Sequence, residues 1–340
     1  MKNLLYVGNH LKSSQTNTSY SAVLGPLLEQ SGYQVRYTSD KTNKMLRLLE
    51  MLWTTFRARK KTDLVLIDTY STQNFYYAVL VGQLCRLLKL RYIPLLHGGN
   101  LPNRLKNSPK LSQRLFKNAY TNVSPSLYLK HSFEEFGYQN VVYIPNTITI
   151  ENYPYHKKTF DVPRLLWVRS FSEIYNPKLA VEVLYELIQR GYDATLTMVG
   201  PDSDESLSQV RALAATLNVP VNFTGKLSKK AWIDLSTDYN VFMNTTNFDN
   251  MPVSVIEAMA LGLPVVSTDV GGMPYLIDSG VDGVLVVPND KEVMADAIET
   301  FFEDRYRTDA MVVRAREKVE GFDWEKVREL WGEVLQIEDF

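Results

Sequence analysis

The sequence has 340 residues, 45% of them hydrophobic, and a formal net charge of −1. At about 100–200 residues per domain, this length predicts two folded domains and argues against a chain that is disordered throughout. No apolar run approaches the roughly 20 residues that span a bilayer, and the opening MKNLLYVGNH is broken too early for a signal peptide, so we expect a cytoplasmic protein. The single cysteine, Cys85, lies in an apolar pattern typical of a buried thiol, which argues against disulfide, redox or zinc chemistry.

Charge is divided unevenly along the chain. The first 160 residues hold 21 Lys and Arg and 8 Asp and Glu, whereas the remaining residues hold 16 and 30. A basic half of this size indicates a polyanionic partner, such as nucleic acid or an anionic membrane surface. The alternative is a solvated charged face without a partner.

Short apolar runs alternate with helical patterns through the first 150 residues. The run NLLYVG ends in Gly, as expected of a buried parallel strand, and a helical pattern at 19–32 leads to a second strand at 33–39. The further predicted strands are 63–68, 91–98, 119–124 and 141–146. This alternation predicts a parallel sheet covered by helices.

The pattern restarts after a polar, aromatic stretch at 147–163. It predicts strands at 164–170, 194–200, 221–225, 239–244 and 264–269, with helices at 177–191, 206–218, 228–237 and around 254–262. We therefore predict an α/β fold of two doubly wound Rossmann-like domains, 1–150 and 151–323, followed by a terminal helix in 324–340 that crosses back to the first domain. Ligands bind outside the carboxyl ends of the strands in such sheets, so we expect the chemistry in a cleft between the domains.

The segment NFDNMPVSVIEAMALGLPVVSTDVGG, residues 247–272, places two carboxylates around a helix entrance. Pro252 suits the first turn of a helix that a Gly-x-Pro sequence then ends, so Asp249 precedes the helix and Glu257 lies about one turn inside it. With the hydroxyl of Ser254 and free N–H groups between them, this unit can bind a molecule that carries both hydroxyls and phosphates. The alternative is a helix whose acids merely favour its dipole, with Glu257 in a partly buried ion pair.

Here the sequence resembles the retaining glycosyltransferases of family 4, which have a GT-B fold. The segment DNMPVSVIEAMALGLPVVSTDVGG is similar to that family's Glu-x7-Glu segment, and the likeness covers most of the chain. In chain order, the other stretches that resemble family motifs are SPSLYLKHSFEEFGY, IPNTI, LLWVRSFSEIYNPKLAVEVL, LTMVGPD and NFTGKLS. The resemblance implies two Rossmann-like domains that face each other across a cleft.

The resemblance also implies residues that bind the donor. Arg169 and Lys178 match a basic pair that neutralises the donor diphosphate, and a strand-end Arg with a Lys near the next helix start can clamp such a group. Glu257 matches the glutamate that holds the ribose hydroxyls, and Asp249 falls where the family usually has a glutamate that contacts the donor sugar. For Arg169 and Lys178 taken singly, surface ion pairs are the alternative. The remaining matched positions are Asn250, Met251, Val253 and Ser254, through their backbone N–H groups, and Gly200 and Leu227, which line the nucleoside pocket.

One candidate lies in the first domain. His97, in LLHGG, matches a histidine at the carboxyl end of a strand that faces the donor sugar, and the two glycines after it suit close approach of a ligand. We expect His97 to orient or polarise the sugar rather than attack it; a structural histidine is the alternative. The family's Gly-Gly pair after the first strand is replaced here by Gln15 and Thr16.

The stretch 41–61, KTNKMLRLLEMLWTTFRARKK, carries seven Lys and Arg and one Glu. Its apolar residues are close to one helical stripe: Met45, Leu48, Leu49, Leu52, Trp53 and Phe56. A basic amphipathic helix with an aromatic anchor suits an anionic membrane surface, which would make a lipid-linked acceptor plausible. The alternative is an ordinary helix that buries this stripe on its sheet.

From these residues and the resemblance, we predict a retaining hexosyltransferase that moves a sugar from a nucleotide-diphosphate donor, UDP or GDP more than others, to an acceptor hydroxyl. The acceptor is expected in bacterial surface polysaccharide, lipopolysaccharide or glycolipid synthesis, at the inner face of the plasma membrane, with no nucleic acid partner. No Asp-x-Asp-like cluster stands in a suitable loop, so we expect no metal or other cofactor, with Arg169 and Lys178 supplying the positive charge. The alternatives are a GT-B nucleotide-sugar epimerase or phosphorylase, and a non-catalytic module that binds glycans or membranes.

Overall fold

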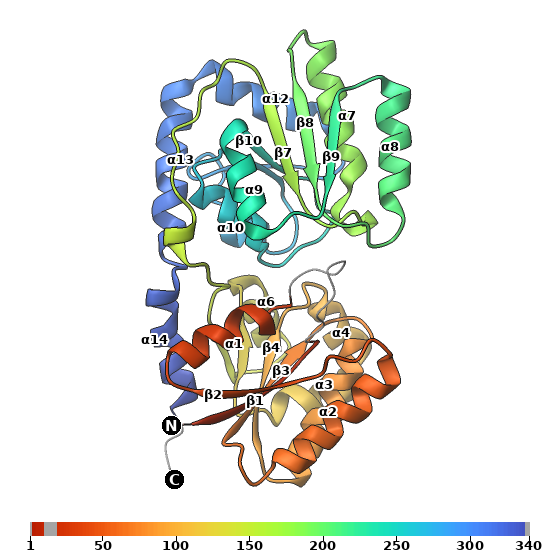
Figure 1. Ribbon diagram of the computed structural model, residues 1–340, viewed down its shortest axis with the longest axis vertical. Helices are drawn as coiled ribbons and strands as arrows, with labels where there is room; N and C mark the ends of the chain where they lie inside the picture. Colours follow the sequence, from red (N-terminus) through yellow and green to blue (C-terminus); the bar gives the residue numbers. More distant parts are fainter. Residues whose placement is uncertain (1, 10–18, 337–340) are drawn as a thin grey trace. The chain divides into compact units, whose positions relative to one another are not determined.

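The computed structural model of the chain describes residues 2–9 and 19–336 and consists of two compact units (Figure 1). Unit 1 comprises Met1–Asn146 and Trp324–Phe340, and unit 2 comprises Thr147–Asp323. The first boundary lies four residues before the predicted one at 150 because the backbone N–H of Ile148 and the hydroxyl of Thr147 both donate to the carbonyl of Phe322, at 3.1 and 2.9 Å. These bonds tie the start of the linker to unit 2.

Unit 1 is built on a six-stranded parallel sheet of order β2-β1-β3-β4-β5-β6. The strands are β1 Asn3–Val7, β2 Gln34–Thr38, β3 Leu64–Thr69, β4 Arg91–Leu96, β5 Asn122–Ser124 and β6 Val141–Tyr143. Its helices are α1 Ser21–Gln30, α2 Lys44–Ala58, α3 Asn74–Leu87, α4 Leu101–Asn107, α5 Pro109–Ser112, the π-helical turn η1 Gln113–Lys117, α6 Leu127–Glu135 and α14 Trp324–Leu335. The strand order reverses between β1 and β3, so the carboxyl ends of these two strands form the switch point where such sheets bind ligands.

Side chains alternate between the two faces of this sheet. In β1, Leu5 belongs to the apolar core on one face, whereas Leu4 and Tyr6 belong to the core on the other. The second core also contains Trp324 and Trp331, which α14 brings back from the end of the chain. The described part of the terminal helix therefore completes the core of unit 1.

Unit 2 is built on a second six-stranded parallel sheet, of order β12-β11-β10-β7-β8-β9. The strands are β7 Arg164–Val168, β8 Thr195–Val199, β9 Val221–Gly225, β10 Val241–Asn244, β11 Val265–Thr268 and β12 Val284–Val286. The helices are η2 Ile150–Asn152, η3 Glu173–Tyr175, α7 Pro177–Gln189, α8 Ser206–Leu217, α9 Lys229–Leu235, η4 Ser236–Asp238, α10 Val253–Ala260, α11 Met273–Leu276, α12 Lys291–Glu303 and α13 Arg305–Glu320. Here the switch point lies between β7 and β10.

The predicted α/β class and the parallel sheets are confirmed. The elements between 270 and 320 were not predicted: α11, β12, α12 and α13. They are integral to unit 2, since Met294, Ile298 and Phe301 of α12 are fully buried in its core. Among the described residues, the structure contains no helix that is both long and apolar enough to cross a bilayer.

Candidate functional site

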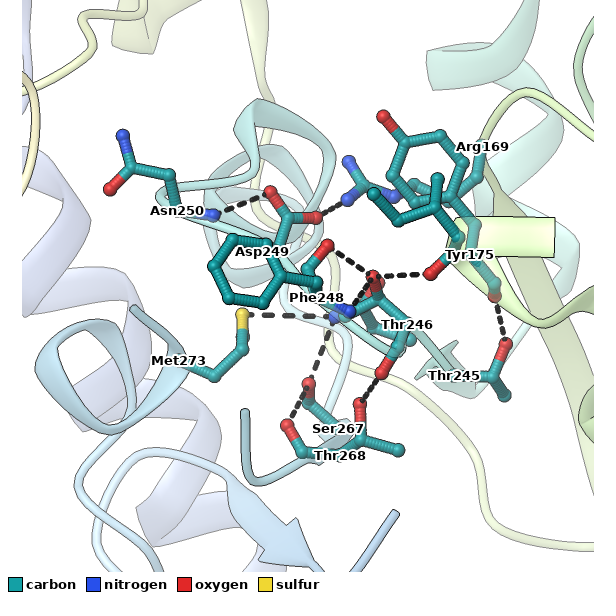
Figure 2. Close-up of polar contacts among 12 residues, drawn as sticks. Arg169, Tyr175, Thr245, Thr246, Phe248, Asp249, Asn250, Ser267, Thr268 and Met273 are labelled. Atoms are coloured by element: carbon teal, nitrogen blue, oxygen red, sulfur yellow. Dashed lines mark hydrogen bonds and ion pairs between the residues drawn. The ribbon is translucent and has the colours of Figure 1, made fainter. Parts of the chain in front are cut away.

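The loop between β10 and α10 lies at the switch point of unit 2, and Arg169 directly follows the neighbouring strand β7. The guanidinium of Arg169 forms an ion pair with Oδ2 of Asp249, as Figure 2 shows. The phenol ring of Tyr175 covers the guanidinium at 4.2 Å from its centroid. Two residues that were predicted to bind the donor, Arg169 and Asp249, are therefore paired with each other in this structure.

This pair is shielded from water. The side chains of Arg169 and Asp249 are 11% and 15% exposed, and within the described residues Nε of Arg169 has no hydrogen-bond partner. Burial lowers the pKa of the Arg169 guanidinium because it removes solvation from the charged form. A desolvated cation with an unused donor gains more from an incoming anion than an exposed one does.

Glycines allow the backbone to come close around the pair. Gly200 has φ +153°, and a Cβ there would overlap the carbonyl of Arg169. Gly271 and Gly272 pack directly on the carbonyls of Asp249 and Asn250, which leave no room for a side chain, and the N–H of Gly272 donates to the Asp249 carbonyl at 3.0 Å. The paired glycines therefore hold the loop before α10 in place.

Glu257 lies inside α10 and is 2% exposed. Its Oε1 accepts a hydrogen bond from the hydroxyl of Tyr153 at 2.6 Å and is ion-paired with Nζ of Lys229. Burial and the neighbouring carboxylate raise the pKa of Tyr153, so the phenol stays protonated and remains a donor. The geometry holds one carboxylate oxygen by two donors and fixes the direction of the other.

The other predicted donor-binding residues lie around the start of α10 or against an apolar core of unit 2. Ser254 lies in the first turn of α10, and its Oγ is buried without a hydrogen-bond partner among the described residues. Asn250 and Met251 are buried in the loop before the helix, and Val253 and Leu227 are half-buried against one apolar core. Because a helix start carries free N–H groups, the start of α10 suits an anion.

Lys178 is not bonded to these groups. It is exposed at the second position of α7, and no hydrogen bond or ion pair joins it to another described residue. The predicted cationic clamp is therefore formed only on the Arg169 side. Lys178 is free to turn toward a ligand.

His97 belongs to unit 1 and directly follows β4. Its Nε2 lies 3.0 Å from Oδ1 of Asp68, and the rings of Tyr20 and Tyr70 lie 4.6 and 5.5 Å from its own ring. Gly98 was predicted to suit close approach of a ligand; a Cβ there would overlap the backbone nitrogen of Ser71, so the packing inside unit 1 also requires glycine. Gln15 and Thr16 lie outside the described residues.

Asp68 is a functional candidate that the sequence reasoning missed. It is 7% exposed at the end of β3, and its Oδ1 accepts from both His97 and the hydroxyl of Tyr6, at 3.0 Å each. Its Oδ2 is buried, has no partner among the described residues and lies where a Cβ on Gly8 would be. The available signal was an acidic residue that ends an apolar strand at the switch point.

Known proteins are similar to this chain in sequence and in fold. Residues 155–318 match the family model described as Glycosyl transferases group 1. The chain is 24% identical over 262 residues to the amylovoran biosynthesis glycosyltransferase AmsK of Erwinia amylovora, which covers 73% of this chain and 64% of that protein. It is 32% identical over 109 residues to the sulfoquinovosyl transferase SQD2 of Arabidopsis thaliana, which covers 31% and 21%. The matched stretches span less than a quarter of the length of the first three curated relatives.

Two solved structures are similar over nearly the whole chain. Sucrose-phosphate synthase from Thermosynechococcus elongatus has a TM-score of 0.81, with 16% identity and 98% of each chain covered. Alr3699/HepE of Anabaena, in complex with UDP-glucose, has a TM-score of 0.80, with 17% identity and coverage of 98% of this chain and 99% of that one. These likenesses confirm the predicted GT-B fold.

Proposed function

We propose that the chain transfers a sugar from a nucleotide-diphosphate donor to an acceptor hydroxyl, on the premise that residues 155–318 match the family model Glycosyl transferases group 1. The observation that carries the proposal is the buried Arg169–Asp249 pair at the switch point of unit 2, beside the start of α10. A family domain without catalytic function would have little reason to bury an unsatisfied guanidinium there.

Arg169 and the start of α10 are proposed to bind the donor diphosphate. The unused Nε of Arg169 and the free N–H groups of the first helical turn are donors for phosphate oxygens, and the hydroxyl of Ser254 adds another. Lys178 would move its exposed ammonium to the same group. These cations are proposed to stabilise the charge that develops on the leaving diphosphate, so that no metal is needed.

Glu257 is proposed to bind the ribose. Tyr153 and Lys229 hold Oε1, which leaves Oε2 to accept from a ribose hydroxyl. Gly200 and Leu227 are proposed to line the nucleoside, because Gly200 lets the backbone pack closely beside Arg169 and Leu227 supplies an apolar side chain. UDP is the first nucleotide to test, since the structurally similar HepE of Anabaena was solved with UDP-glucose; GDP is the second.

Asp249 and His97 are proposed to contact the donor sugar. In the reaction, the bond from the anomeric carbon to the diphosphate oxygen breaks, and the acceptor oxygen forms its bond on the same face. The acceptor proton passes to a phosphate oxygen of the leaving group. Asp249 would orient a sugar hydroxyl while it holds Arg169, and His97 would use the ring atoms that Asp68 leaves free.

The acceptor is proposed to be a hydroxyl of a glycan or lipid-linked glycan in bacterial surface polysaccharide, lipopolysaccharide or glycolipid synthesis. The named role of AmsK in amylovoran biosynthesis supports the polysaccharide class. Such acceptors are assembled at the cytoplasmic face of the membrane, where we place this protein as a peripheral enzyme.

A thermal-shift screen with UDP, GDP, ADP and their sugars tests the proposal, followed by assays of nucleotide release in EDTA. We expect one nucleotide to raise the melting temperature, Lys178→Ala to weaken that shift, and the matching nucleotide sugar to be hydrolysed or transferred. The exposed control Lys230→Ala should leave the shift unchanged. If no nucleotide binds and no nucleotide sugar is consumed, the proposed function is wrong.

A further inference from the structure

The solvent-facing side of α2 is apolar. Met45, Leu46, Leu49, Trp53 and Phe56 are 68%, 56%, 58%, 61% and 41% exposed. Four of them are spaced by four, four and three residues and so lie on one side of the helix. A helix that covers a sheet usually turns such a stripe inward.

The opposite side of α2 explains this orientation. The residues that α2 buries are Arg47, Met51, Thr55 and Ala58. The guanidinium of Arg47 donates to the carbonyls of Lys41 and Thr42 and to Asn9 Oδ1, at 2.7–3.0 Å. This network and the buried Met51 fix the helix on unit 1. The sequence left open whether α2 buries its apolar stripe on the sheet. For Met45, Leu49, Trp53 and Phe56, which are exposed, burial on the sheet is wrong.

Cations stand at both ends of the apolar side. Lys41 and Lys44 are exposed before or at the start of the helix, and Arg57, Lys60 and Lys61 are exposed at its end or just after it. The acidic neighbours are already engaged: Glu50 accepts from the hydroxyl of Ser39, and Asp40 pairs with Lys41 at 3.2 Å.

We propose that this side of α2, which we call the α2 face (Met45, Leu46, Leu49, Trp53 and Phe56), docks on an anionic lipid membrane. Trp53 and Phe56 stack at 6.1 Å, which gives a broad amphipathic anchor suited to the depth of lipid headgroups. The flanking cations would contact lipid phosphates.

Charge favours lipid over the other occupants of an apolar face. In a second copy docked through the same face, the cations at the two ends would approach like charges. An anionic leaflet supplies negative charge along the whole length of the helix. The proposal deepens the peripheral placement in the proposed function, on which it rests, by naming the surface that binds lipid; the vesicle tests do not depend on which sugar is transferred.

Trp53 supplies a direct signal for the test. The chain has five tryptophans, of which Trp53 is 61% exposed and the other four are at most 5% exposed. Fluorescence of the full chain is titrated with phosphatidylcholine vesicles that contain or lack phosphatidylglycerol. We expect the tryptophan emission to shift to shorter wavelengths only with vesicles that contain phosphatidylglycerol. The Trp53→Phe variant should not show this shift.

Flotation of the same vesicles measures binding itself. We expect Leu49→Ser combined with Trp53→Ser to weaken binding by about tenfold or more, while Tyr306→Ser, at an exposed site of α13, leaves it unchanged. Lys60→Glu with Lys61→Glu should weaken it as well. The matched control reverses two exposed lysines outside α2, Lys106→Glu with Lys117→Glu, and should weaken vesicle binding less.

Several outcomes would overturn the proposal. These are no binding to anionic vesicles, equal losses from the two charge-reversal pairs, or full binding by a folded Leu49→Ser/Trp53→Ser protein. Self-association that this double substitution abolishes, without vesicle binding, would assign the α2 face to a second copy. Nucleotide binding and hydrolysis in solution, measured on the same variants, report on the proposed function separately.

Discussion

The Nε2 atom of His97 lies 3.0 Å from Oδ1 of Asp68, a buried carboxylate that also accepts the hydroxyl of Tyr6. Because a carboxylate oxygen accepts, the hydrogen bond places a proton on Nε2 and fixes the orientation of the imidazole ring. Asp68 is therefore a positioning residue for His97, in a unit that the family model does not match.

Asp68→Asn should lower kcat about 10- to 100-fold, because a hydrogen bond to a charged group is worth about 1.5–3 kcal/mol. Nucleoside diphosphate affinity should stay the same, since the residues proposed to bind the donor lie in unit 2. Asp63→Asn, at an exposed Asp before the same strand, serves as control. Steady-state kinetics and calorimetric binding measure the two effects. Equal turnover for both variants would remove Asp68 from the account.

Asp249→Asn tests whether Asp249 restrains Arg169. Removing the carboxylate charge frees the guanidinium for phosphate, so the nucleoside diphosphate should bind at least as tightly as to the wild-type chain. Turnover of the nucleotide sugar should fall, because the proposed contact between the Asp249 carboxylate and the sugar is lost. Calorimetry with the nucleoside diphosphate and a nucleotide-release assay separate these effects. Weaker diphosphate binding would contradict the assignment.

Tyr153→Phe removes the hydroxyl that donates to Glu257 at 2.6 Å. We expect a loss of about 1–3 kcal/mol in the free energy of unfolding, because a buried carboxylate loses a donor, and weaker nucleoside binding. Tyr155→Phe alters an exposed tyrosine two residues away and should do neither. Denaturant unfolding and nucleotide titration are the measurements. Identical behaviour of the two variants would show that the Tyr153 hydroxyl does not matter.

Lys158 predicts a pH dependence of stability. It is 8% exposed, its Nζ donates to the carbonyl of Ser236 at 2.9 Å, and burial lowers its pKa from 10.5 to about 8. Below pH 8 both folded and unfolded chains hold this proton, and the buried charge destabilises the fold. Between about pH 8 and 10.5 the unfolded chain binds more protons, so the free energy of unfolding gains up to on the order of 3 kcal/mol as the pH rises.

Lys158→Met lacks this gain. Its stability relative to the wild-type chain should therefore fall between about pH 7 and about pH 10, as measured by denaturant unfolding. Lys157→Met, which alters the exposed neighbour paired with Asp309, should show no comparable fall. A constant difference between Lys158→Met and the wild-type chain would contradict the lowered pKa.

The sequence predicted the fold well where patterns are local. Apolar strands that alternate with helices located the sheets, and the Gly-x-Pro stop located the end of α10, where Gly262 has φ +77°. The helices α12 and α13 were missed although they carry helical patterns. The exact linker boundary depended on hydrogen bonds between Thr147 and Phe322, which no local pattern encodes.

The site was predictable in its residue types but not in its pairing. The sequence identified Arg169, Asp249 and Glu257 as candidates, yet it did not indicate that Arg169 and Asp249 contact each other. Asp68 was missed because its partner His97 is 29 residues away and they meet only when β3 and β4 pair. Long-range partners of this kind require the tertiary structure.

Calorimetric titration of UDP and GDP into the wild-type chain, Arg169→Gln and Glu257→Gln measures whether these two residues bind the donor, with Arg164→Gln, at the half-buried start of β7, as control. We expect one nucleotide to bind the wild-type and control chains, and each site variant to bind it about 10- to 100-fold more weakly. Binding that is unchanged in both folded site variants would contradict the claim that Arg169 and Glu257 hold the donor.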